Sequence, residues 1–271
     1  MNRPPHGKPA DQEQAADPVR SRTRFPASAD GWTAAQRSNA AAPRSNPVPG
    51  LVSPTGLGLD SSMVRQAMVA RLAAQGLSRP AVLQALGAVE RHRFVDSALA
   101  HQAYEDTSLP IGLGQTISKP SVVGRMLDLA LEGRSALPRR VLEIGTGCGY
   151  QAAVLSRIAH EVYSIERLRA LHEKARGNLR HLRLPNLHLI LGDGMLGYPA
   201  GAGYDVIVAA AGGASIPRTW LDQLAPGGRL VAPAEQECGM QCLVVIDRLA
   251  QGFVRTVLEA VHFVPLKSGI A

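Results

Sequence analysis

Three glycines at alternate positions, Gly145, Gly147 and Gly149, directly follow a short apolar segment, and this arrangement constrains the fold more than any other part of the chain. Residues 141–144 have the apolar and β-branched character of a buried strand, and residues 150–159 have the composition of a helix. A strand, a glycine-rich turn and a helix in this order are typical of the first unit of a Rossmann-like sheet, where the turn opens a nucleotide pocket. An ordinary tight turn between a strand and a helix is the alternative.

The spacing of the glycines and two nearby acids narrow the class of ligand. The pattern is G-x-G-x-G, whereas turns that bind dinucleotides have G-x-G-x-x-G. Glu143 lies two residues before the first glycine, where a carboxylate would repel phosphates. Glu166 ends the next apolar segment, where a carboxylate can accept hydrogen bonds from ribose hydroxyls. These features favour a cationic nucleoside without phosphates, such as S-adenosylmethionine, over NAD.

The length and composition of the chain exclude several classes of protein. Its 271 residues suffice for one α/β domain with an appendage. No apolar run reaches the roughly 18 residues that span a bilayer, and the first 50 residues contain no signal-peptide core, so we expect a cytoplasmic protein with no membrane partner.

Charge and cysteine content argue against nucleic-acid and metal binding. Residues 1–50 hold seven Lys/Arg against four Asp/Glu and thus contribute +3 of the net charge of +7, while only 4% of the residues are aromatic. We therefore expect no nucleic-acid partner. No histidine or further cysteine lies near Cys238 and Cys242, so we expect no metal site.

Residues 1–57 are rich in Pro, Ala and Arg and are expected to form a disordered tail. The ordered domain is then residues 58–271, with a helical and substrate-loop part at 58–135 and a nucleoside-binding core at 136–271. We expect an α/β fold in which a mostly parallel, twisted sheet has helices on both faces, an antiparallel C-terminal edge and a small N-terminal helical extension. Residues 109–114 are expected to form a loop. The expected strands are residues 141–144, 162–165, 187–191, 205–209, 229–232 and 242–246.

Ligands of such sheets bind at the carboxyl ends of the strands. Asp193 follows the third expected strand between two glycines and is placed to reach the exocyclic amine of adenine; a turn residue is the alternative. The expected S-adenosylmethionine site comprises Glu143, Gly145, Thr146, Gly147, Gly149, Glu166, Asp193 and Gly194.

Ser118 lies outside this nucleoside core, in a loop just before an expected helix. Its hydroxyl could cap that helix, or it could be presented to a substrate beside the amide groups of the first helical turn. From the residues alone, the helix cap is the favoured interpretation.

Five stretches of sequence change that interpretation. They are residues 109–120 (LPIGLGQTISKP), 141–153 (VLEIGTGCGYQAA), 162–166 (VYSIE), 192–194 (GDG) and 224–231 (LAPGGRLV). Together they resemble the protein-L-isoaspartate (D-aspartate) O-methyltransferases. The resemblance runs from about residue 63 to the C-terminus, and the first stretch is its most specific part.

The resemblance implies a Rossmann-like methyltransferase domain that transfers a methyl group from S-adenosylmethionine and leaves S-adenosyl-L-homocysteine. The implied acceptor is the α-carboxylate of L-isoaspartyl residues in damaged proteins, with the β-carboxylate of D-aspartyl residues as a second one, and the ester then collapses to a succinimide. By position, Ser118 is the implied active-site hydroxyl, with Thr116 and Ile117 beside it at the substrate. Glu166 is the implied ribose ligand and Asp193 the implied adenine ligand. We expect a monomer whose partners are isoaspartyl proteins.

The nucleophile is an ionised carboxylate, so no strong general base is needed. We expect the amide groups at the start of the helix after Ser118 to hold the second oxygen of this carboxylate.

The chain departs from the family pattern at Cys148, at Lys119 and at Gly212–Gly213, and the last two bear on substrate preference. A methyltransferase with another acceptor, a non-catalytic S-adenosylmethionine-binding protein and an NAD-dependent oxidoreductase are the alternatives.

Overall fold

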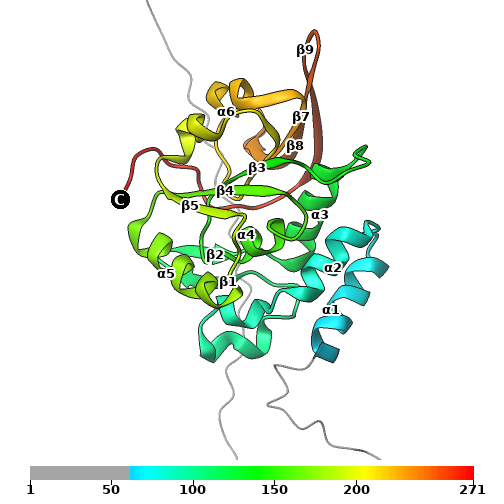
Figure 1. Cartoon of the computed structure of the whole chain (residues 1–271), viewed down its shortest axis with the longest axis vertical. Helices are drawn as coiled ribbons and strands as arrows, with labels where there is room; N and C mark the ends of the chain where they lie inside the picture. Colours follow the sequence, from blue (N-terminus) through cyan, green and yellow to red (C-terminus); the bar gives the residue numbers. More distant parts are fainter. Residues whose placement is uncertain (1–61) are drawn as a thin grey trace, which may run out of the picture. The chain divides into compact units, whose positions relative to one another are not determined.

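The structure is a computed structural model, and it describes residues 62–271 of the chain (Figure 1). The predicted disordered tail at residues 1–57 and the predicted start of the domain at residue 58 lie outside this range. Within the range, no helix is long and apolar enough to cross a bilayer.

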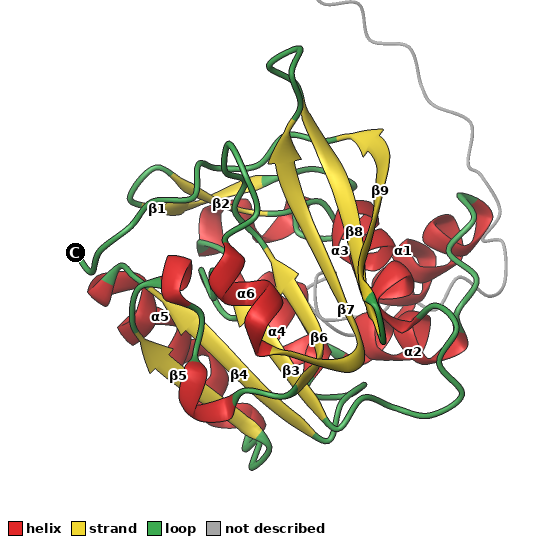
Figure 2. Ribbon diagram, turned by 90° about the horizontal axis from the view of Figure 1, so that it is seen from above, coloured by secondary structure: helices red, strands yellow, loops and turns green. Residues whose placement is uncertain are grey.

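A seven-stranded sheet forms the centre of the fold, in the order β5-β4-β3-β6-β7-β8-β9 (Figure 2). Neighbouring strands from β5 to β7 are parallel, and β8 and β9 continue the sheet antiparallel. This confirms the predicted α/β fold with its antiparallel C-terminal edge. The bounds are β3 Arg140–Ile144, β4 Glu161–Glu166, β5 Leu187–Leu191, β6 Tyr204–Ala209, β7 Leu224–Glu235, β8 Gln241–Leu249 and β9 Gly252–Ala260.

The strand order places a crevice at the carboxyl end of β3. The chain runs outward from β3 through β4 to β5 and then returns to β6 on the other side of β3. At such a reversal the connections leave in opposite directions, which opens a binding site between them. The glycine turn that follows β3 therefore lies at this point.

Alternate residues along the strands pack on opposite faces of the sheet. Val141 and Val162 belong to the larger core, which helices α1 to α5 cover, whereas Leu142 and Ile144 belong to a second core that contains Trp220 of α6. In Figure 1, α6 lies above the parallel strands and the other helices lie below them. The bounds are α1 Ser62–Ala74, α2 Pro80–Ala88, α3 Pro120–Leu131, α4 Tyr150–Leu155, α5 Arg169–Leu179 and α6 Arg218–Gln223.

The amphipathic pattern of α5 illustrates why these segments are helical. Leu171, Ala175 and Leu179 recur every four residues and are buried against the sheet. Short 3-10 turns complete the chain path: η1 Arg91–Phe94, η2 Ser97–Gln102, η3 Arg180–Leu182, η4 Gly194–Leu196 and η5 Pro199–Gly201.

The expected loop at residues 109–114 is instead part of a two-stranded hairpin, formed by β1 Leu109–Gly112 and β2 Gln115–Ile117. The prediction was wrong because Gly112 and Leu113 make the turn with positive φ angles of 100° and 53° while the flanking apolar residues alternate. Leu109, Ile111 and Ile117 are buried on one side of the hairpin.

Several other bounds differ from the prediction, and two of them differ by at least four residues. The helix expected over residues 150–159 ends at Leu155, where the Ser156 hydroxyl donates a hydrogen bond of 2.8 Å to the Ala153 carbonyl. A hydroxyl that bonds back to the preceding turn competes with helix continuation. Strand β7 begins at Leu224, five residues before the expected start, and its pairing with β6 is irregular between Tyr204 and Val206.

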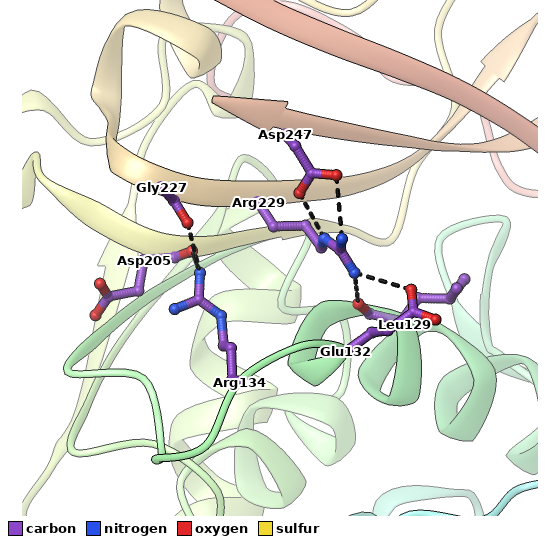
Figure 3. A network of polar contacts seen from close by, with 7 residues as sticks. All are labelled: Leu129, Glu132, Arg134, Asp205, Gly227, Arg229 and Asp247. Atoms are coloured by element: carbon purple, nitrogen blue, oxygen red, sulfur yellow. Dashed lines mark hydrogen bonds and ion pairs between the residues drawn. The ribbon is translucent and has the colours of Figure 1, made fainter. Parts of the chain in front are cut away.

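A polar network anchors the C-terminal end of α3 to the antiparallel part of the sheet (Figure 3). Arg229 on β7 donates to both carboxylate oxygens of Asp247 on β8, at 2.6 and 3.0 Å. It also donates to the Leu129 carbonyl at 2.9 Å and to Glu132 at 3.0 Å. These bonds fix α3, and the N-terminus of that helix follows Ser118.

Candidate active site

A cavity of about 390 Å³ opens at the carboxyl ends of β3, β4 and β6. This volume is in the range of small-molecule sites, about 300–1,000 Å³. The structure brings two groups of predicted residues to this one cavity, although they come from separate parts of the chain. The predicted residues that line it are Thr116, Ile117, Ser118, Gly145, Thr146, Gly147, Glu166 and Gly194.

The glycine turn and Glu166 hold each other in place. The Gly147 amide donates to one carboxylate oxygen of Glu166, and the Leu168 amide donates to the other, both at 2.9 Å. Gly147 has a φ of +57°, and a Cβ at this position would lie 3.2 Å from Ile111 of the hairpin. The missing side chain therefore lets the turn approach the hairpin, while the Glu166 carboxylate stays at the cavity with lone pairs to spare.

Glu143 lies behind the turn rather than at the cavity. Its side chain is fully buried and accepts a hydrogen bond from the Ser164 hydroxyl, which lies 2.6 Å from the hydroxyl oxygen of Thr146. Burial raises the pKa of Glu143 to about 8, and the charge of Glu166 adds to this rise. Burial thus favours the neutral form of this carboxyl, which weakens the argument that it repels phosphates in the folded protein.

Gly149 and Asp193 also lie outside the cavity lining. A Cβ on Gly149 would lie 2.8 Å from the side chain of Leu179, so this glycine serves the packing of α5. Asp193 accepts one hydrogen bond from the Met195 amide at 2.8 Å and another from the Gly269 amide at 2.7 Å. Its carboxylate therefore connects the end of β5 to the C-terminal segment.

The C-terminal segment was missed as part of the site. Residues 264–267 line the cavity between the glycine turn and Ala210. The Leu266 amide donates to the Gly212 carbonyl at 2.7 Å, and a Cβ on Gly212 would lie 2.7 Å from the side chain of Gln241. A Cβ on Gly213 would lie 3.4 Å from the side chain of Leu266, so Gly213 allows close passage of this segment, whereas Gly212 makes room for Gln241. The sequence signal was the apolar run at residues 263–266, far from the other site residues along the chain.

Ser118 does not cap α3. The N-cap residue is Lys119, without a side-chain cap, and the amide and hydroxyl of Ser121 donate to Asp106 at 2.9 and 2.7 Å. The expectation that the first helical amides hold a substrate oxygen is therefore wrong for Ser121, and Pro120 has no N–H. Among the described residues, the hydroxyl of the half-buried Ser118 has no hydrogen-bond partner, and Ser118 is part of the cavity lining.

A buried arginine holds the backbone of Ser118. Arg91 is completely inaccessible to solvent, and it donates to the carbonyls of Ser118 at 2.7 Å, Ala103 at 2.8 Å and Thr107 at 3.3 Å. Burial lowers its pKa. Its guanidinium lies 4.8 Å from the ring centre of Tyr150, whose own pKa burial raises to about 12. Arg91 thus joins the serine loop to the residue that follows the glycine turn.

Within residues 62–271, no three His, Cys, Asp or Glu side chains are grouped as a metal ion would require. Cys148, Cys238 and Cys242 are free thiols, and burial raises the pKa of Cys148 to about 11. The cavity lining has one carboxylate, that of Glu166, together with main-chain groups and polar side chains that include Thr116, Ser118, Thr146, Gln115, Gln151, Arg167 and Lys267. This donor set suits a nucleoside with ribose hydroxyls at Glu166 and a polar acceptor at Ser118.

Known proteins resemble this chain over most of its described residues. A family model described as protein-L-isoaspartate(D-aspartate) O-methyltransferase matches residues 63–271. The chain is 62% identical over 221 residues to a protein-L-isoaspartate O-methyltransferase from Methylibium petroleiphilum, which covers 80% of this chain and 82% of the relative. It is 52% identical over 257 residues to the enzyme of the same name from Burkholderia mallei, covering 94% and 79%.

Solved structures show the same fold. A protein-L-isoaspartate O-methyltransferase is 28% identical, with a TM-score of 0.69, and the match covers 76% of this chain and 67% of that one. A Plasmodium falciparum protein in complex with S-adenosyl-L-homocysteine is 22% identical, with a TM-score of 0.64, and the match covers 75% and 98%.

Proposed function

Because the chain belongs to the protein-L-isoaspartate (D-aspartate) O-methyltransferase family, we propose that its cavity is where a methyl group passes from S-adenosylmethionine to the α-carboxylate of an L-isoaspartyl residue. The protein is an S-adenosylmethionine-dependent protein carboxyl methyltransferase. The observation that carries the assignment of the site is the meeting of Glu166 and the free Ser118 hydroxyl at one cavity.

The residues that line the cavity form two groups, a cofactor half around Glu166 and a substrate half around Ser118. Glu166, which two amides hold in place, accepts hydrogen bonds from the ribose hydroxyls, and Gly145, Thr146, Gly147 and Gly194 form the wall around the nucleoside. S-adenosylmethionine, when bound, supplies a methyl group activated by a positively charged sulfur.

The glycine loop and the nucleoside have further support outside the cavity lining. Glu143 and Gly149 stabilise the loop from behind, through Ser164 and Leu179 respectively. Asp193 is proposed to contact the adenine amine at the rim, where its carboxylate already holds the C-terminal segment.

In the substrate half, Ser118 donates a hydrogen bond to the isoaspartyl carboxylate and turns one of its oxygens toward the cofactor half. Thr116 and Ile117 line the same side of the cavity. The carboxylate is already ionised at neutral pH, with an ordinary pKa near 3.5–4, so it needs no base to become a nucleophile. Alignment of the reacting atoms then supplies most of the rate, and such orientation lowers barriers by about 7–11 kcal/mol in favourable cases.

The decisive experiment compares two peptides that differ only in an isoaspartyl or a normal aspartyl residue, with labelled S-adenosylmethionine as donor. We expect label on the isoaspartyl peptide alone, as a base-labile ester. A peptide with a D-aspartyl residue tests the second acceptor. Cofactor binding without transfer to any peptide would contradict the proposed acceptor.

We also propose that the enzyme acts as a monomer in the cytoplasm, on damaged proteins. In support of the compartment, the three cysteines are free thiols, as is usual in a reducing environment. Light scattering of the active protein tests the oligomeric state.

A further inference from the structure

A groove leads away from the proposed methyl-transfer site. A second cavity of about 330 Å³ shares Thr116, Ser118, Ala210 and Val264 with the first one. A third cavity of about 370 Å³ shares residues with the second in turn. The three cavities therefore lie next to one another in a row, which we call a path, and this row begins at the proposed cofactor site and passes Ser118.

The walls of this path come from α3 and from the end of β9. Val122 on α3 faces Ala260 and Val261 across the point where the second and third cavities meet. Strand β9 is the edge of the sheet, and Ala260 is exposed there. An open path beside a strand edge suits an extended polypeptide, whose main chain can be bound whatever its sequence.

Charge along the path is uneven. In the third cavity each carboxylate has an arginine partner: Glu259 lies 2.8 Å from Arg125, and Asp128 lies 3.3 Å from Arg79. In the second cavity the lining includes Lys119 and no Asp or Glu. Among the residues that the structure describes, no carboxylate lies within ion-pair distance of Lys119.

We propose that this path, the flank groove, holds the polypeptide on one side of the isoaspartyl residue, and that Lys119 makes the enzyme prefer sites with an acidic side chain nearby. The inference rests on the proposed function, because the groove is continuous with the site at Ser118. An acidic neighbour gains an ion pair with a cation that lacks one, whereas a lysine neighbour meets a like charge.

The test uses short isoaspartyl peptides that are identical except for Glu, Gln or Lys at one neighbouring position, placed in turn on each side. The wild-type enzyme is expected to show kcat/KM about two- to fivefold higher with Glu than with Gln, the size of effect for a partly exposed ion pair, and lower again with Lys. The preference falls at high salt, because exposed charges are screened.

Three variants test whether Lys119 causes the preference for an acidic neighbour. Lys119→Gln should bring the ratio of kcat/KM for the Glu and Gln peptides to one, and Lys119→Glu should invert it. Arg180→Gln is the matched control, since it removes one exposed cation in η3, outside the lining of the three cavities, and should keep the wild-type ratio. A wild-type ratio of one, or a preference that persists in Lys119→Gln, would overturn the role of Lys119.

The groove itself is tested by peptide length. Extending the peptide on the side that shows the charge preference should raise kcat/KM in the wild type, and Ala260→Phe, which fills the groove, should abolish that gain. A gain that survives in Ala260→Phe would overturn the groove. Absence of methylation of every isoaspartyl peptide is a different result, because it would overturn the proposed function together with this inference.

Discussion

The Ser118 hydroxyl has no internal partner in the described part of the chain, and the mechanism gives it one task, which is to orient the substrate carboxylate. We expect Ser118→Ala to lower kcat/KM about 10- to 100-fold, the worth of one hydrogen bond to a charged group. The dissociation constant of S-adenosylmethionine, measured by calorimetry, should stay the same. Loss of cofactor binding in this variant would remove Ser118 from the substrate half.

The buried Glu143 leads to a prediction about pH and stability. Its pKa is raised to about 8 in the folded protein, so folding favours its protonated form. The contribution to stability is fully present below about pH 4.5 and is lost as the pH rises through about 8. Glu143→Gln keeps a neutral side chain at every pH and should remove this dependence.

Urea unfolding at about pH 5, 7 and 9 measures the effect. Between the first and last pH, the free energy of unfolding of the wild type should fall relative to Glu143→Gln by a few kcal/mol, on the order of one per pKa unit. The exposed Glu237 provides the matched control, and Glu237→Gln should follow the wild type. Parallel curves for the wild type and Glu143→Gln would show that Glu143 is ionised when folded.

At the scale of elements, Arg91 connects η1 to η2 and to the loop after β2 through three carbonyls. We expect Arg91→Met to lower the free energy of unfolding by about 2–4 kcal/mol, since it leaves partly buried carbonyls without donors. Its kcat should fall as well at temperatures where the variant is folded, because Ser118 loses its support. Arg93→Met, at an exposed neighbour, should change stability by less than about 1 kcal/mol. Equal stability of both variants would contradict the role of Arg91.

Some of these elements could be predicted from the sequence, and others could not. The glycine turn and the acid that ends β4 were predictable from the sequence. Each of them directly follows or ends a short apolar segment, which is a local feature of the chain. The hairpin of β1 and β2 was not, because strands of four and three residues leave almost no periodic signal. The burial of Glu143 depends on which face of β3 it occupies and on Ser164 of the next strand, and neither is visible along the chain.

At the scale of the whole molecule, the cavity is closed by residues that lie more than a hundred positions from the glycine turn. Sequence patterns could not place residues 264–267 there, because the partners of the C-terminal segment are distant along the chain. The end of the chain lies beside β5 and α5 (Figure 1). The hydrogen-bond partners of the C-terminal segment follow three different strands, since Arg167 comes after β4, Asp193 after β5 and Gly212 after β6.

Asp193 has two roles that variants can separate. It binds the C-terminal segment through the Gly269 amide, and it is proposed to contact the adenine amine. Gly269→Pro removes the amide that binds Asp193 and is incompatible with the φ of +76° at this position, so it should release the segment. We expect it to raise the dissociation constant of S-adenosylmethionine about five- to tenfold, the loss of about one hydrogen bond. Asp193→Ala should raise it further, because the adenine contact is lost too. Equal effects of the two variants would mean that Asp193 acts through the segment alone.

The C-terminal segment is attached almost entirely through its main chain. Gly269 and Ala271 pair with Arg167, Arg169 and Asp193 through amides and carbonyls, and Leu266 pairs with Gly212 in the same way. The side chains of residues 267–271 are exposed and can vary while the path of the backbone stays the same, whereas Leu266 packs against the core that contains Trp220. A scan that replaces each residue by alanine would therefore score most of this segment as dispensable, although it forms a wall of the cavity. Proline substitutions or deletions, which act on the backbone, are the changes that would reveal it.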